Sequence, residues 1–151
     1  MTPVDVVREA PCPFALLDGI SRADATGLAA WRESGETPFW MALEAAAQAA
    51  ALHQRRLADF GAHAFLLSLG SCRWCAAPFS GRLELHARLL GRSAGAAAYD
   101  VTLCPEHAPA LSLSVHIGLT PYDDVFRREL LQERYRTLWE KLAGSVARGC
   151  F

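Results

Sequence analysis

The sequence of 151 residues has neither a charge excess nor an apolar run long enough to cross a bilayer. Its formal net charge is −1, which removes the electrostatic basis for nucleic acid as the main partner. The first ten residues, MTPVDVVREA, contain a proline and charges where a signal peptide would have its apolar region. We therefore expect a cytoplasmic protein that binds neither nucleic acid nor a membrane.

The cysteines do not suggest a disulfide framework, because there are five of them, an odd number. Cys72 and Cys75 have a CxxC spacing, but no second Cys or His pair has the spacing of zinc ligands. Both lie in HAFLLSLGSCRWCAAP, which we predict as a strand, where side chains three apart point to opposite faces. We interpret them as structural thiols and expect no metal and no cofactor.

What the sequence does contain is a high share of apolar residues, 52%, beside 21% charged residues. These values are typical of one compact domain with a sizeable core. Residues 38–60 are rich in alanine and predict a long helix that is apolar on nearly every side. Such a helix belongs inside a protein, so the polar side chains of Glu44 and Gln48 within it need an explanation.

The segments around this helix have the patterns of strands and of a second helix. Residues 13–23 and 26–34 predict two strands joined by a turn, and strict alternation predicts further strands at 82–89, 99–103 and 111–119. The side chains expected to face the helix are Leu83, Leu85, Val101, Leu111, Leu113 and Val115. Residues 122–147 predict an amphipathic helix whose apolar stripe is Leu131, Tyr135, Leu138 and Leu142.

Thr-Pro pairs at residues 2–3, 37–38 and 120–121 are expected to open three helices, since Thr caps free amides and Pro fits the first helical position. Asp123 follows the third pair where a carboxylate suits a helix N-terminus. The order of elements favours an α+β hotdog fold, with one long central helix wrapped by an antiparallel sheet and a C-terminal helix added. We expect a hotdog domain at 1–121 and, at 122–151, a C-terminal helical extension of the same domain.

Four stretches carry a resemblance to a known family: TPFWMALEAAAQAAALH, HAFLLSLGSCRW, FSGRLELHARLL and GAAAYDVTL. They resemble the 3-hydroxyacyl-ACP dehydratase branch of the hotdog superfamily, and most closely its aryl-polyene-type dehydratase-like subunits. That group has an aromatic residue before the central helix, a Glu and an Ala-Gln pair within it, and a Phe-Leu-Leu strand after it. These features map onto Trp40, Glu44, Ala47-Gln48 and residues 65–67. The resemblance covers about residues 6 to 119.

The sequence departs from the family at its catalytic histidine. Housekeeping dehydratases carry a His-Phe-Pro-Gly loop before the helix glutamate, whereas this chain has AAWRESGETPFWMAL there, without histidine. Cys12 occupies the position of another family histidine. Cys12 is either a nucleophile or an inert buried thiol, and its Pro-Cys-Pro setting supplies no base, which favours the inert thiol.

The resemblance implies that Glu44 is the general acid of a dehydration, protonating the 3-hydroxyl that leaves as water. It places Gln48, Trp40 and Cys12 around the substrate. The structural alternative is that Glu44 and Gln48 share one helix face and bond each other at a wet edge. The histidines are weaker candidates: we expect His53 near the exposed end of the helix, His86 and His116 on the polar phase of strands, and His63 and His107 near turns.

Three functions therefore remain open. The leading one is a degenerate or accessory dehydratase-like subunit that handles (3-hydroxy)acyl thioesters on acyl carrier protein. The second is an active 3-hydroxyacyl-ACP dehydratase, or an acyl thioesterase, that uses Glu44. The third is a non-catalytic acyl-binding or interaction protein. The resemblance implies acyl carrier protein or an acyl-CoA thioester as partner, and a homodimer or a heterodimer with a related hotdog subunit.

Overall fold

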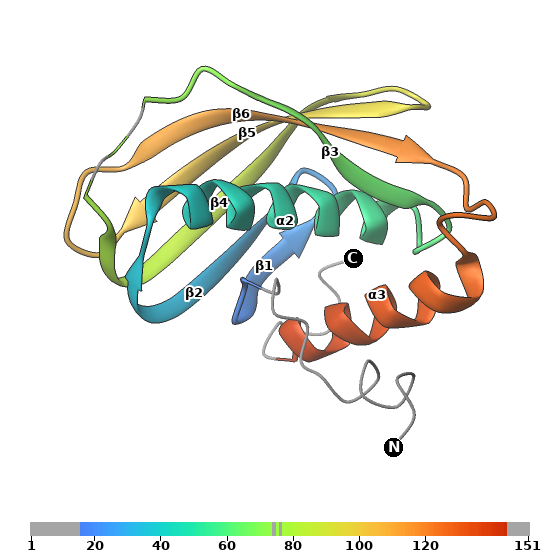
Figure 1. The fold of residues 1–151 in the computed structure, drawn as a ribbon, viewed down its shortest axis with the longest axis horizontal. Helices are drawn as coiled ribbons and strands as arrows, with labels where there is room; N and C mark the ends of the chain where they lie inside the picture. The colour runs from blue at the N-terminus through green and yellow to red at the C-terminus, as the bar shows by residue number, and fades with distance from the viewer. Residues whose placement is uncertain (1–15, 74, 76, 145–151) are drawn as a thin grey trace.

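The computed structural model describes residues 16–73, 75 and 77–144, so the helix expected after Thr2-Pro3 and the site residue Cys12 lie outside the described part. Six antiparallel strands form one sheet that curves around the first described helix (Figure 1). The elements are β1 (Gly19–Asp24), β2 (Gly27–Thr37), α2 (Phe39–Leu57), β3 (His63–Gly70), β4 (Phe79–Arg92), β5 (Ala96–Pro105), β6 (Leu111–Thr120) and α3 (Arg128–Leu142). This arrangement confirms the predicted α+β hotdog architecture.

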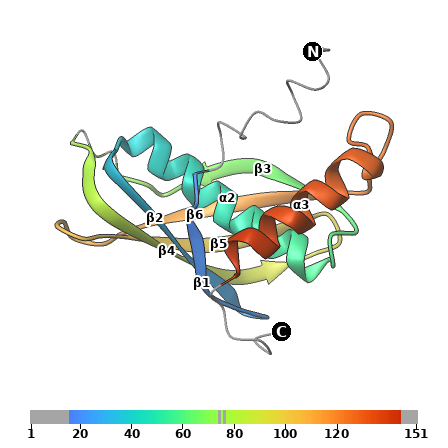
Figure 2. The same cartoon turned by 90° about the horizontal axis from the view of Figure 1, so that it is seen from below.

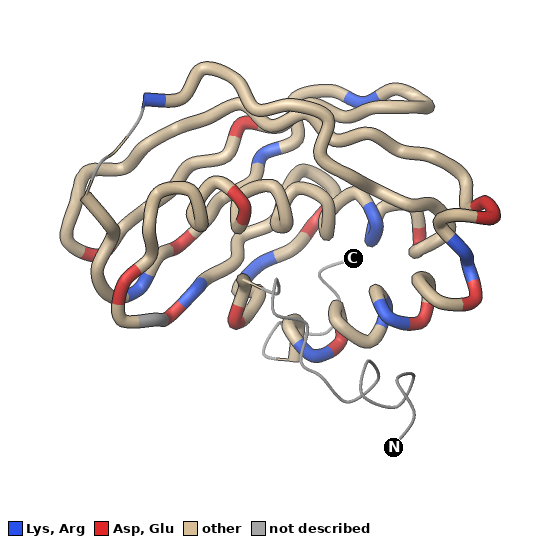
Figure 3. Tube along the Cα trace, viewed as in Figure 1, with Lys and Arg blue, Asp and Glu red and all other residues tan. Residues whose placement is uncertain are grey.

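The strand order is β1-β2-β4-β5-β6-β3, which leaves β1 and β3 at the two edges. Both helices lie on the same face of the sheet, as the turned view shows (Figure 2). The path of the chain along α2 carries few charges compared with that along α3 (Figure 3). A helix with few charges fits the inner position, because burying an unpaired charge is costly.

The core forms where small helix side chains meet large strand side chains. Five alanines of α2 have no exposed surface, namely Ala42, Ala45, Ala46, Ala49 and Ala50. The opposing strand residues Leu83, Leu85, Val101, Leu113 and Val115 are at most 2% exposed, and Leu111 packs against the same cluster while partly buried. The alternation of the strands thus predicted the core-facing set correctly.

The helix boundaries differ from the Thr-Pro prediction. At Thr37-Pro38 the helix does begin, but Thr37 ends β2 and its hydroxyl accepts a hydrogen bond from Arg32 Nε (3.2 Å) rather than capping α2. The helix ends at Leu57, before the predicted residue 60, because Asp59 and Phe60 adopt left-handed φ angles of 49° and 58°.

The third Thr-Pro pair does not open a helix, and that prediction was wrong. α3 begins at Arg128, seven residues later than Pro121. The reason is local: the Asp123 carboxylate accepts hydrogen bonds from the amides of Val125 (2.8 Å) and Phe126 (2.7 Å), which closes a turn instead.

The strand predicted through the CxxC pair was also wrong. β3 ends at Gly70, where Ser71 takes a left-handed φ of 49° and breaks the extended path. Cys72 is exposed and Cys75 is partly buried in the following loop, and both are free thiols. No group of three His, Cys, Asp or Glu side chains in the described residues is arranged to hold a metal ion.

The core assignment predicts the cost of removing a strand side chain. Leu85→Ala should lower the free energy of unfolding by about 2–5 kcal/mol, because Leu85 is fully buried and its removal leaves a cavity. Leu90→Ala is the matched control on the same strand, since Leu90 is 54% exposed, and it should cost about 0.5 kcal/mol or less. Urea denaturation measures both, and equal losses would contradict the assigned inner face of β4.

Candidate functional site

Coverage of α2 is uneven along its length. From Ala45 to Gln54 every side chain except Gln48 is buried, whereas Trp40 is 61% exposed and Glu44 is exposed. The C-terminal part of α2 is the part that α3 contacts, through Arg55 and Arg56 against α3 aromatic rings. One face of the first turns of α2 is therefore uncovered in the described chain, and we call this exposed face, which carries Trp40 and Glu44, the opening.

Glu44 lies at this opening and not in the interior. In the single chain neither α3 nor the sheet covers this face of α2, so the carboxyl is exposed although most of the helix is apolar. The Glu44 side chain has no hydrogen-bond or ion-pair partner within the described part of the chain. An exposed carboxylate carries little desolvation cost, so no structural pairing is needed to explain it.

Gln48, one turn further along, holds the segment that leads into β1. Its Oε1 accepts a hydrogen bond from the amide of Leu16 (2.9 Å), and Arg32 Nη1 donates to the carbonyl of the same residue (3.2 Å). Arg32 Nη2 also contacts Met41 Sδ on the first turn of α2 (3.1 Å). The Leu16 peptide is thus held from both sides beside the opening, and Gln48 has a positioning contact in addition to its predicted substrate role.

The free edge strand β3 presents an apolar surface. Four of its side chains are 37–53% exposed, namely Phe65, Leu66, Leu67 and Leu69, and the strand contains no Asp, Glu, Lys or Arg. Soluble proteins usually protect edge strands with charges, proline or a covering segment. β3 starts at the C-terminal end of α2 and runs back over it (Figure 1).

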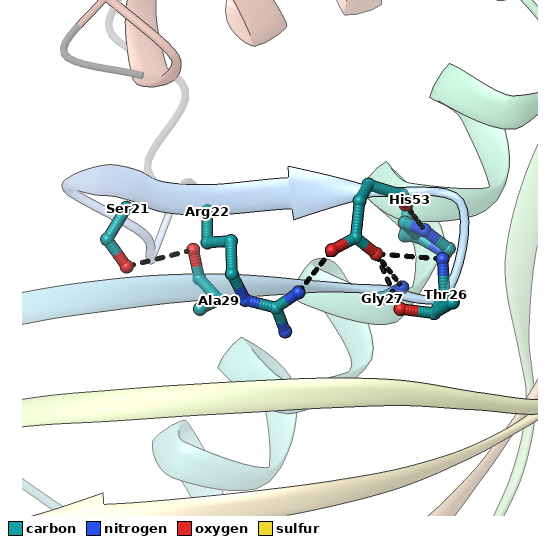
Figure 4. A network of polar contacts seen from close by, with 7 residues as sticks. Ser21, Arg22, Thr26, Gly27, Ala29 and His53 are labelled. Atoms are coloured by element: carbon teal, nitrogen blue, oxygen red, sulfur yellow. Dashed lines mark hydrogen bonds and ion pairs between the residues drawn. The ribbon is translucent and has the colours of Figure 1, made fainter. Parts of the chain in front are cut away.

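His53 corrects the sequence prediction, since it is fully buried instead of near an exposed helix end. Its Nδ1 lies 2.6 Å from the Tyr99 hydroxyl. Its Nε2 lies 2.7 Å from the Asp24 carbonyl oxygen, the contact drawn beside His53 in Figure 4. Gln54 Nε2 donates to the same hydroxyl (2.6 Å), so Tyr99 donates to Nδ1 and His53 carries its proton on Nε2. Burial lowers the pKa of His53, which favours this neutral form.

The position of His53 had a signal in the sequence. It follows Ala49 by four residues and Ala50 by three, so it shares the helix face of alanines that point into the core. The turn beneath it is also well ordered by Asp24, whose carboxylate accepts from the Thr26 hydroxyl (2.6 Å) and amide (2.8 Å). The Thr26 hydroxyl is the main cause of the lowered pKa of Asp24.

None of the other histidines contacts Glu44 either, and all five histidines of the chain are described. His86 and His116 are exposed on the sheet face opposite α2, where Ser68 Oγ lies 3.2 Å from His116 Nδ1. His107 is exposed in a turn next to Glu106, and His63 stacks on Phe126 with ring centroids 4.1 Å apart. A histidine that acts together with Glu44 has to come from another molecule.

Comparison with known proteins identifies the fold. No protein-family model matches the sequence, and no curated protein matches it. Among solved structures, the chain is similar to the dehydratase heterocomplex ApeI:P from Xenorhabdus doucetiae, with a TM-score of 0.62 and 15% identity, over 83% of this chain and 94% of that one.

Two thioesterases are also similar. The enzyme HI1161 from Haemophilus influenzae has a TM-score of 0.56 and 12% identity, over 68% of this chain and 77% of that one. A variant of PA1618 from Pseudomonas aeruginosa has a TM-score of 0.58 and 13% identity, over 68% of this chain and 80% of that one. The chain has the hotdog fold, and its structural neighbours are hotdog dehydratases and thioesterases. No helix in the described residues is long and apolar enough to span a membrane.

The two polar residues of α2 should differ in their effect on stability. Glu44→Gln should change the free energy of unfolding by about 0.5 kcal/mol or less, because the carboxyl is exposed and without a partner in the described chain. Gln48→Leu should cost about 1–3 kcal/mol, since it leaves the Leu16 amide without its acceptor. Urea denaturation of both variants provides the comparison. A loss for Glu44→Gln equal to that for Gln48→Leu would mark Glu44 as a structural charge.

Proposed function

We propose that this chain is a dehydratase-like hotdog subunit that handles (3-hydroxy)acyl thioesters on acyl carrier protein, as an accessory subunit completed by a related, histidine-bearing hotdog subunit. One observation carries the proposal. Glu44 is exposed on the first turns of α2, the edge strand β3 is apolar and exposed, and none of the five histidines contacts Glu44. The site has an acid and an open face, but no base.

The chemistry assigned to the site is the loss of water from a 3-hydroxyacyl thioester. A base on the partner removes the proton next to the thioester carbonyl, and Glu44 donates a proton to the leaving 3-hydroxyl, which gives an enoyl thioester and water. Trp40 and Gln48 flank the acid on the same helix, and Cys12 belongs to the proposed substrate-binding set from sequence.

The partner is proposed to dock along β3. Its four exposed apolar side chains and the lack of Asp, Glu, Lys and Arg in the strand favour strand pairing with a subunit of similar shape. A heterodimer is preferred over a homodimer, because a second copy would bring the same five histidines, of which two are buried in packing contacts. The similarity to a dehydratase heterocomplex supports this pairing.

Within the superfamily we assign the chain to the aryl-polyene type of dehydratase-like subunit, which acts in the cytoplasm. The aromatic Trp40 ahead of Glu44, the Ala47-Gln48 pair and residues 65–67 support this assignment. Hydrolysis is the second candidate reaction, with Glu44 activating water against an acyl thioester. The structural similarity to two thioesterases supports hydrolysis as this second candidate.

Turnover of 3-hydroxyacyl-ACP tests the proposed function. The purified chain alone should give enoyl product near background, and the chain with a co-purified histidine-bearing hotdog subunit should give sustained turnover. In that complex Glu44→Gln should lower the rate by about 10²–10⁴-fold, the usual contribution of general acid–base catalysis. Glu140→Gln, an exposed carboxyl on α3, is the matched control and should leave the rate unchanged.

Each other outcome selects a different function. Robust turnover by the chain alone, lost in Glu44→Gln, would contradict the accessory role and establish an active dehydratase with another base. Release of free acid from an acyl thioester would establish a thioesterase. Binding of acyl-ACP without any product, with or without the second subunit, would establish an acyl-binding protein.

A further inference from the structure

α3 is attached to the rest of the molecule by aliphatic packing, with Leu142 in the core and Leu138 against it, and by aromatic rings. Trp139 of α3 packs edge-on against Phe60 (centroids 6.4 Å apart), and the Arg56 guanidinium carbon lies 5.8 Å from the Trp139 ring centre. Arg55 lies closer, 3.8 Å above the ring of Tyr135. The ion pairs of α3 in the described residues, which are Arg127–Glu129 and Arg136–Glu133, are local and do not join α3 to the sheet.

His63, the first residue of β3, lies inside this junction. Its ring stacks on Phe126 of the segment before α3, with centroids 4.1 Å apart and planes 15° apart, and it is near-parallel to Tyr135 at 6.2 Å and Phe65 at 5.8 Å. The residue is only 7% exposed, and its buried Nδ1 has no hydrogen-bond partner among the described residues. A neutral imidazole fits this stack. A second proton on the ring would make Nδ1 a buried donor with no acceptor, which is unfavourable.

The charged groups around His63 also oppose protonation on balance. From α2, Arg55 faces it and donates from Nη2 to the carbonyl of the adjacent Ala64 (2.9 Å), and no carboxylate pairs with this guanidinium in the described residues. Asp123, in the segment before α3, carries a negative charge that favours protonation of His63. Its carboxylate already accepts hydrogen bonds from two backbone amides. From α3, the titratable group that faces His63 is the phenol of Tyr135. Burial first, and then the Arg55 charge, lower the pKa of His63.

We propose that His63 is a pH-sensitive latch, whose protonation releases α3 from the C-terminal half of α2 and from the start of β3. The release uncovers the C-terminal end of α2, where Arg55 and Arg56 contact the α3 rings. The latch rests on the junction alone, so it does not depend on whether the chain proves to be a dehydratase.

The sign of the pH dependence follows from the preference for the neutral ring. With α3 released, His63 is in water and has its ordinary pKa of about 6.5, while the docked form binds the proton less readily. Docking is therefore strongest above pH 6.5 and weakens as the pH falls through 6.5 toward the lower pKa of the docked form. One proton changes the docking equilibrium by at most about tenfold per pH unit.

Amide hydrogen exchange of the full chain, corrected for the intrinsic rate at each pH, tests the latch. Residues 128–142 of α3 should lose protection by up to about tenfold between pH 6.5 and pH 5.5, while residues 99–103 of the core strand β5 keep theirs. His63→Phe retains the aromatic stack and cannot titrate, so its α3 protection should not change with pH. His53→Gln, at the other buried histidine, should keep the response of the unchanged chain.

A second variant keeps the test decisive if His63→Phe does not fold. Arg55→Met removes the neighbouring positive charge and keeps an unbranched stem, so the docked form accepts the proton more readily and the loss of protection should shrink. The proposal is overturned if α3 protection in the unchanged chain is independent of pH, or if His63→Phe responds as that chain does. It is also overturned if β5 loses protection in parallel with α3, which would indicate global unfolding.

Discussion

The structure depends on packing one alanine-rich helix against the inner face of a curved antiparallel sheet. The fully buried alanines of α2 let the strand backbones approach the helix axis, and large side chains from the strands fill the remaining space. Leu83, Leu85 and Val101 each contribute apolar surface that the helix itself does not supply. Burial of this kind is the main favourable term in folding, and close packing makes each buried position sensitive to a change in volume.

The same packing decides which polar groups are structural and which are exposed. His53, Gln54 and Tyr99 lie where α2 is fully enclosed, and they bond one another and the Asp24 carbonyl. Glu44 lies where the enclosure ends, because α3 contacts the other end of α2. The polar network therefore lies between α2 and the sheet, whereas the acid lies on a face of α2 that neither the sheet nor α3 covers.

The regular part of the fold could be predicted from sequence, and the irregular part could not. Strict alternation in β4, β5 and β6 predicts both the strands and their inner faces, because the side-chain period of a strand matches the pattern directly. The ends of elements depend on local turns. The turn at Asp123 makes α3 start later than predicted, and the left-handed φ of Ser71 makes β3 end earlier than predicted. The exposure of Glu44 depends on where α3 and the sheet lie, which periodicity along one helix does not report, whereas the spacing of His53 from Ala49 and Ala50 does indicate its burial.

The central claim is that Glu44 belongs to a site that another subunit completes. The most direct measurement is a crystal structure of this chain in complex with the hotdog subunit that co-purifies with it. We predict that the partner docks along β3 and places an imidazole nitrogen beside Glu44, within about 2.6–3.2 Å directly or through one water. A complex in which Glu44 still faces bulk solvent, with no titratable side chain of the partner near it, would contradict the claim.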